Sequence, residues 1–486
     1  MATVRRQTGF VKHRMGETGQ TSAEAAFTNL ARTKDGRGIR GTTARHRCEE
    51  GGLGERPIGL VAMLDDGEIR PDQQHGNEGA DDTLAMLLAL ASSPEDLEVV
   101  MISVTYGNVP LEACVRNVVG LFKVLDHEIE WRKAQGKPLG FEGLRTYKPI
   151  VALGPEHALE DEILMADNFH GADGLHGVHE AHPHLSPDET WKAMFKQDQS
   201  TPTEVASYHQ YFTPSKVPAH REILRILKEE PADTISICAL GPLTNLALAA
   251  SEDPETFLRV KEIAVMGGAV EVEGNVTPVA EFNTFADAVA TARVFALTSP
   301  VPSSTMPPVP TGKSTLPPYP EKLSRQLNLS LFPLDITTPH LLNLNPFRET
   351  VKPHVVAGSP LATWVNTFME GIFRQIISMV GDAEEPGLSL HDPLTIWYML
   401  TGSSPEWKLA KGAPEDIRVE TAGQWSHGMH VTDRRGRVRA DGKTREEIVG
   451  DEDGWLSFKR GNRINRYVSS PGFDAFAPYL LARLFD

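Results

Sequence analysis

The chain has 486 residues, 40% of them hydrophobic, which is enough to bury a large core in one α/β domain or in two to three smaller ones. Its formal charge of -17 excludes a general nucleic-acid-binding protein, because such proteins gather Lys and Arg against phosphates. Three cysteines are too few and too scattered for a disulfide framework, and no apolar run approaches the ~18 residues that span a bilayer. We therefore expect a cytoplasmic protein with a small-molecule partner, no nucleic acid and no membrane.

Composition divides the chain near residue 56. Residues 1–56 carry 11 Lys and Arg against 6 Asp and Glu and show no helical or strand period. We predict that they form a disordered, atypical N-terminal extension. Residues 57–486 are predicted to form a single large α/β domain with loop insertions.

Short apolar runs alternate with helical stretches along this second region. Strands are predicted at 59–64, 98–105, 149–153, 234–239, 262–266 and 331–335. Helices are predicted at 82–92, 111–125, 220–229, 243–250, 286–296 and 360–379. Such alternation indicates crossover connections and an open, mostly parallel Rossmann-like sheet with helices on both faces.

Three segments interrupt the alternation: the charged stretch 126–148, the stretch 180–216 and the proline-rich stretch 300–320. The proline-rich segment is predicted to be a surface loop, because proline cannot donate to a sheet ladder or a helix interior. It contains Gly312-Lys313-Ser314, but no glycine lies five positions earlier and no strand-to-helix turn frames it. We therefore reject a phosphate-binding loop there.

Polar clusters follow the predicted strands, and in open α/β sheets ligands bind beyond the carboxyl ends of the strands. The first cluster is Asp81-Asp82, directly ahead of an apolar helix, and it suits both a helix N-terminus and a hard cation. Taken singly, each cluster is typical of an ordinary cap or turn. The others lie at 105–108, 241–245, 267–269, 274–283 and 391–393.

Taken in chain order, these clusters resemble the inosine-uridine preferring nucleoside hydrolases, over residues 79 to about 435, and the large inserts resemble the longer fungal members. The resemblance implies hydrolysis of the N-glycosidic bond of purine or pyrimidine ribonucleosides to ribose and free base, in nucleoside salvage. It also implies a calcium ion and a homodimer or homotetramer.

The resemblance assigns roles to residues of this chain. The carboxylates of Asp82 and Asp392 and the backbone carbonyl of Leu240 would bind Ca2+, which prefers oxygen ligands. His391 would lie beside the leaving base as a proton donor, and His170 would be a second histidine of the base pocket. The neighbouring His176 and His179 are expected to be surface or loop residues. The ribose hydroxyls would be bound by Asp81, Asn108, Asn275, Glu281 and Asn283.

The chain departs from the family just before Asp81. The family motif there is Asp-x-Asp-Pro-Gly-x-Asp-Asp, whereas residues 75–82 read His-Gly-Asn-Glu-Gly-Ala-Asp-Asp. An ungapped alignment places Asn77 where the family has an aspartate that binds the metal and serves as the base. Asparagine offers calcium one oxygen but cannot accept a proton from water. The alternative function is therefore a catalytically impaired nucleoside- or ribose-binding protein.

Two further interpretations of this region stay open. The strand at 59–64 ends in Asp65-Asp66, so Asp66 would supply the base if residues 67–76 loop out. We favour the ungapped alignment, because a ten-residue excursion is costly in a turn that must position a base. The segment before Gly79 would otherwise be read-through from a mispredicted exon boundary.

Near the C-terminus, Trp425 is expected to pack in the core rather than to stack on the base.

Overall fold

The computed structural model describes residues 58–64, 80–107, 109–159, 173–188, 190–196, 207–308, 316–380, 385–436, 450–457 and 459–486. The predicted extension 1–56, the Gly312-Lys313-Ser314 segment and the residues between 64 and 80 lie outside these ranges. Residues Glu55–Asp486 form one compact unit. No helix within the described ranges is long and apolar enough to cross a membrane.

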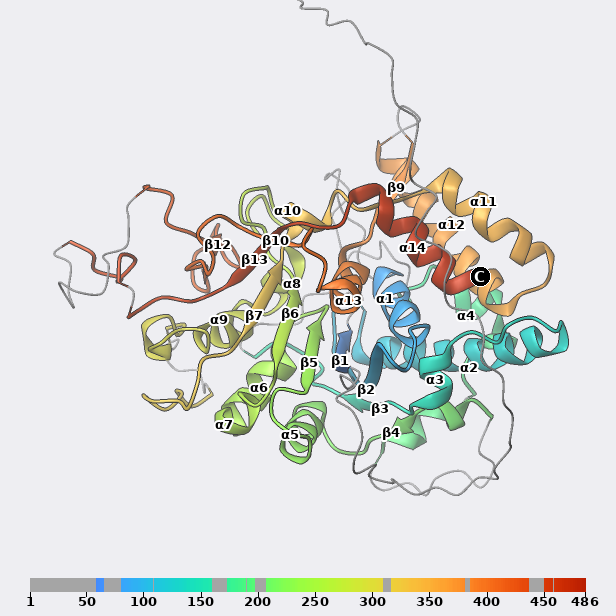
Figure 1. The fold of residues 1–486 in the computed structure, drawn as a ribbon, viewed down its shortest axis with the longest axis horizontal. Coiled ribbons are helices and arrows are strands. Elements are labelled where there is room, and N and C mark those ends of the chain that lie inside the picture. The colour runs from blue at the N-terminus through green and yellow to red at the C-terminus, as the bar shows by residue number, and fades with distance from the viewer. Residues whose placement is uncertain are drawn as a thin grey trace, which may run out of the picture. The chain divides into compact units, whose positions relative to one another are not determined.

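Within the described residues, nine strands form one sheet in the order β10-β13-β7-β6-β5-β1-β2-β3-β4 (Figure 1). Every neighbouring pair is parallel except the edge pair β10–β13. The strands are β1 (Ile58–Leu64), β2 (Leu97–Val104), β3 (Ile150–Leu153), β4 (Thr213–Pro214), β5 (Ile235–Ala239), β6 (Glu262–Met266), β7 (Leu329–Phe332), β10 (Lys408–Leu409) and β13 (Asn465–Ser469). Two small antiparallel pairs join β8 (Leu341–Asn343) to β9 (Gly387–Ser389) and β11 (Arg418–Val419) to β12 (His430–Val431).

Alternate strand residues face two separate cores, one on each side of the sheet. In β6, Ile263 and Val265 belong to one core, whereas Ala264 and Met266 belong to the other. One core is covered by α1 (Ala80–Leu90), α2 (Leu111–Ala134), α11 (Leu344–Val356), α12 (Pro360–Val380), α13 (His391–Thr401) and α14 (Phe473–Phe485). The other is covered by α5 (Ala219–Glu229), α6 (Thr244–Glu252) and α9 (Ala288–Ala296). Shorter helices are α3 (Glu142–Thr146), α4 (Val178–Ala181), α7 (Pro254–Phe257), α8 (Phe282–Ala286) and α10 (Leu334–Thr337). The predicted fold class is confirmed.

Strand β1 lies at the point where the direction of winding reverses. The chain proceeds from β1 through β2 and β3 to one edge of the sheet, and then from β5 through β6 and β7 toward the other. Ligands of open α/β sheets bind in the crevice at such a switch point, beyond the carboxyl ends of the strands. The residues that follow β1 and β5 are therefore expected to line the site.

Two predicted boundaries are wrong. The strand predicted at 331–335 ends at Phe332 instead, because Pro333 has no N–H for the ladder and precedes helix α10. The helix predicted at 111–125 does not end where the charged stretch begins, since α2 continues to Ala134. Two charged residues of that stretch form a buried pair in this part of α2, in which Arg132 Nε donates to Glu128 Oε1 at 2.7 Å.

Candidate active site

Two helix N-termini meet where the sheet reverses. Helices α1 and α13 pack together, and the backbone N–H of Asp392 donates to Asp81 Oδ2 at 3.2 Å. Asp81 is fully buried, and Asp82 and Asp392 are nearly so. Unpaired helix N–H groups and the helix dipole favour negative charge at both starts. Even so, three buried carboxylates in one cluster are costly unless further donors or a cation compensate them.

The donor chemistry of this cluster suits a hard cation. Leu240 directly follows β5, and its backbone carbonyl accepts from Asn283 Nδ2 at 2.8 Å, which uses one of its two lone pairs. Carboxylate and carbonyl oxygens are the ligands that calcium prefers. Among the described residues, however, no three His, Cys, Asp or Glu side chains assemble into a metal centre by themselves.

Asn283, in α8, presents a buried acceptor next to the Leu240 carbonyl. Its Nδ2 donates to the Leu240 carbonyl and, at 3.4 Å, to Met266 Sδ. Those two contacts fix the orientation of the amide, because its oxygen could not face a carbonyl oxygen. Its Oδ1 is buried and has no hydrogen-bond partner among the described residues. A buried acceptor without a donor is costly, so this atom is suited to a ligand hydroxyl.

Glu281 holds the start of the helix that carries Asn283. It caps α8: Oε1 accepts from the Asn283 N–H at 2.7 Å, and Oε2 accepts from the Thr284 N–H at 3.0 Å and the Gly268 N–H at 2.6 Å. Burial raises the pKa of Glu281, although these hydrogen bonds oppose the shift. A carboxylate offers about four acceptor positions, so three backbone donors leave little capacity for a ligand. Asn275 also supports the start of α8, because its Oδ1 accepts from the Phe282 N–H at 2.9 Å.

His391 begins α13 next to Asp392 and is fully buried. Its Nδ1 lies 2.7 Å from Thr337 Oγ1, the last residue of α10. One ring nitrogen of His391 is therefore held by Thr337.

A second network ties α8 and α9 to neighbouring loops. Asp287 Oδ2 accepts from Thr244 Oγ1 at 2.7 Å and from the Leu159 N–H at 3.0 Å, and its Oδ1 caps α9. Leu159 is the last described residue before the segment that contains His170. Asn245, from the predicted 241–245 cluster, instead donates to Ser103 Oγ at 3.0 Å and so joins α6 to β2.

Among the sequence-predicted residues, Asp81 contacts Asp392 and so lies near Asp82 and His391, while a second set of contacts joins Leu240, Asn275, Glu281 and Asn283 around the start of α8. Four other predicted site residues lie outside the described ranges: Asp66, Asn77, Asn108 and His170.

Two expectations for single residues are wrong. Trp425 does not pack in the core, since 83% of its surface is exposed. His179 is not a surface residue: it is buried in α4, between Ser186 Oγ at 3.0 Å and Asn117 Oδ1 at 2.9 Å.

Sequence reasoning missed Thr337, Asp287 and His430. His430, in β12, is buried and its Nε2 lies 3.2 Å from Thr284 Oγ1, more than 140 positions away in the sequence. Burial lowers the pKa of His430 to about 4. Only Asp287 carries a local signal, because an aspartate between two helical runs is typical of an N-cap.

Comparisons with known proteins agree with this geometry. The profile of the family described as "Inosine-uridine preferring nucleoside hydrolase" matches residues 77–453. An uncharacterized protein of Schizosaccharomyces pombe is 28% identical over 359 residues, covering 73% of this chain and 86% of that protein. The pyrimidine-specific ribonucleoside hydrolase RihA of Escherichia coli K12 is 30% identical with the same coverage.

Solved structures share the fold. A plant nucleoside hydrolase, PpNRh1, superposes with a TM-score of 0.56 at 22% identity, covering 88% of this chain and 99% of that one. A purine-preferring ribonucleoside hydrolase from Gardnerella vaginalis gives a TM-score of 0.55 at 21% identity, covering 88% of this chain and 98% of that one.

Proposed function

The chain belongs to the inosine-uridine preferring nucleoside hydrolase family, and we propose that it is a calcium-dependent enzyme that hydrolyses the N-glycosidic bond of ribonucleosides to ribose and free base. The relatives include a pyrimidine-specific and a purine-preferring enzyme, so the proposal covers both classes of base. We further propose a homodimer or homotetramer that serves nucleoside salvage in the cytoplasm, which the family resemblance supports.

One observation carries the proposal: the buried Oδ1 of Asn283 lacks a donor among the described residues, while both hydrogens of its amide are engaged. A ribose hydroxyl is a donor that fits such an acceptor. A site built to pair hydroxyls rejects deoxy analogues strongly, because loss of the hydroxyl strands a buried polar atom. A preference for ribonucleosides follows.

The carboxylates of Asp82 and Asp392 and the Leu240 carbonyl would hold calcium. When bound, the ion would orient the ribose hydroxyls and lower the pKa of a water molecule near the anomeric carbon. Asp81 accepts from the Asp392 backbone and would bind ribose from the same corner.

Two alignments differ in whether the chain has an acceptor for the water proton. Strand β1 ends at Leu64 at the switch point, and Asp66 follows two residues later in the sequence. This placement supports the looped alignment with Asp66 as the base. The match to the family profile begins at Asn77 and supports the ungapped alignment, in which no base is present. In that case the chain would bind nucleosides without turning them over.

His391 would assist departure of the base. Thr337 holds its Nδ1 in place, and the imidazole would deliver a proton to the leaving base, which departs more readily when neutral than as an anion.

The test uses purified full-length protein, stripped with a chelator and assayed for ribose release from inosine and uridine before and after calcium is returned. We expect release only with calcium. Release that is equal with and without calcium would contradict calcium dependence, and an absence of release in both states would contradict hydrolysis.

A further inference from the structure

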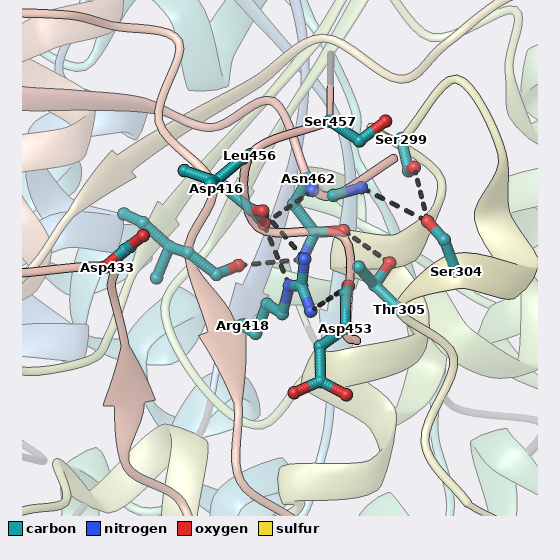
Figure 2. A network of polar contacts seen from close by, with 12 residues as sticks. Ser299, Ser304, Thr305, Asp416, Arg418, Asp433, Asp453, Leu456, Ser457 and Asn462 are labelled. Atoms are coloured by element: carbon teal, nitrogen blue, oxygen red, sulfur yellow. Dashed lines mark hydrogen bonds and ion pairs between the residues drawn. The ribbon is translucent and has the colours of Figure 1, made fainter. Parts of the chain in front are cut away.

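The β11–β12 hairpin is anchored at its base by a buried polar network (Figure 2). Arg418 binds Asp416 through two contacts, Nε to Oδ1 at 3.2 Å and Nη2 to Oδ2 at 3.0 Å, and stacks over Trp455 at 3.8 Å. The Asn462 N–H donates to Asp416 Oδ1 at 2.8 Å, and Thr305 Oγ1 donates to Asn462 Oδ1 at 2.7 Å. Because both side chains of the Arg418–Asp416 pair are largely buried, the pair fixes the start of β11 in one geometry.

The other strand of the hairpin reaches the candidate site. The His430 imidazole lies directly beside Gly268, where an added Cβ would come within 2.0 Å of the ring. Gly268 has φ +85°, so both its conformation and its close contact require glycine. Nearby, a Cβ added at Gly428 would lie 2.9 Å from Phe285 Cα in α8. The hairpin therefore contacts both Gly268, which follows β6, and helix α8.

His430 closes a hydrogen-bond circuit around Glu281. His430 Nε2 lies 3.2 Å from Thr284 Oγ1, and the backbone N–H of Thr284 donates to Glu281 Oε2 at 3.0 Å. Glu281 in turn holds the backbone N–H groups of Gly268 and Asn283.

We propose that His430 is a positioning residue for ribose recognition: through Thr284, Glu281 and Gly268 it holds Asn283 Oδ1 in line with a ribose hydroxyl. The inference rests on the proposed function. Polar groups at a reacting centre must be held within about 0.5 Å, and a misplacement of about 1 Å costs up to about 100-fold in rate. The fixed base of the hairpin makes the ring a rigid support rather than a mobile side chain.

Three variants separate positioning from mere packing. His430→Ala removes the ring and its donor, whereas His430→Gln retains a donor that can reach Thr284. Gln424→Ala changes an exposed residue of the same hairpin and is the matched control. If His430→Ala does not fold, His430→Leu takes its place, because it keeps bulk against Gly268 and removes the donor.

We expect His430→Ala to lower kcat/KM for inosine or uridine by about 10- to 100-fold. The preference for the ribonucleoside over its deoxy analogue should shrink by a similar factor. His430→Gln should restore most of both, and Gln424→Ala should match the wild type. An unchanged ribose-to-deoxyribose preference in His430→Ala would overturn the proposal.

Hydrogen exchange tests the inference without turnover, so it also decides the matter if the wild type proves inactive. We expect the amides of Gly268, Asn283 and Thr284 to exchange at least about 10-fold faster in His430→Ala, while those of helix α5 stay unchanged. Unchanged protection of the three amides, or an equal loss in α5, would refute a local positioning role. An inactive wild type with this local exchange pattern would refute only the proposed hydrolysis.

Discussion

Asp81 accepts a hydrogen bond from the backbone N–H of Asp392, with Oδ2 3.2 Å from the nitrogen, although 311 positions separate the two residues. This contact joins the first turn of α1 to the start of α13 and brings two acidic helix N-termini into one buried corner. The acids that follow from the sequence pattern as separate clusters therefore act as one group in space.

Neutralising one acid of this corner should weaken calcium binding. We expect Asp392→Asn to lower the affinity for calcium by at least about 10-fold, because one charged oxygen ligand is lost while the shape is kept. Calorimetric titration of the chelator-treated protein measures this. Asp474→Asn, an exposed acid in the first turn of α14, is the matched control and should bind calcium as the wild type does. Equal affinities in all three proteins would contradict the assignment of Asp392.

Removal of the buried acceptor should reduce ribose recognition. We expect Asn283→Ala to lower kcat/KM for ribonucleosides by about 10- to 100-fold, the equivalent of about 1–3 kcal/mol for one buried hydrogen bond. Activity on the deoxy analogue that lacks the paired hydroxyl should change much less. Steady-state kinetics on a ribonucleoside and on its 2′-deoxy and 3′-deoxy analogues measure the difference. A uniform loss on all substrates would instead indicate damage to the fold.

Reciprocal variants of the segment between β1 and α1 should identify the base. If Asp66 accepts the water proton, Asp66→Ala should abolish ribose release, and Asn77→Asp should leave it near the wild-type rate. If the ungapped alignment holds, the wild type should be nearly inactive, Asn77→Asp should raise activity, and Asp66→Ala should have little effect. The ratio of the two variant rates to wild type distinguishes the alignments in one series.

Buried histidines should make the fold sensitive to acid. Burial lowers the pKa of His179 from 6.5 to about 4. Between these values the unfolded chain binds a proton that the folded chain does not, so stability is complete above pH 6.5 and falls as the pH drops toward 4. We expect His179→Gln to flatten this decline by up to about 1.4 kcal/mol per pH unit.

Urea unfolding of wild type and variant across pH 4 to 7 measures the difference in slope. Glu262 and Glu281 have pKa values raised by burial, so above pH 4.5 they lower stability as the pH rises. Their contribution is the same in wild type and variant and cancels in the comparison. Parallel slopes would show that His179 does not titrate between the two states.

Local patterns predicted the frame of the site better than its supports. The acidic turn ahead of α1 and the strand at 262–266 were predictable, because apolar runs and caps are local features. The predicted end of the strand at Asp335 was wrong, because Pro333 ends the strand although apolar residues lie on both sides of it. Trp425 was expected in the core on residue type alone, which cannot show on which side of a turn a side chain lies.

The missed residues act over long sequence distances. Thr337 meets His391, and His430 meets Thr284, only after the sheet has assembled. Neither pair has a spacing that a single sequence could reveal. By contrast, Asn283 could be assigned to ribose from the resemblance, but its open acceptor is visible only from the contacts of its amide.

Ribonucleoside hydrolysis is best tested by following nucleoside binding and ribose release in the same calcium-loaded preparation. We expect saturable binding of inosine or uridine together with stoichiometric appearance of ribose and free base over repeated turnovers. Binding without release of ribose would contradict hydrolysis and would identify the chain as a nucleoside-binding protein that lacks the catalytic general base.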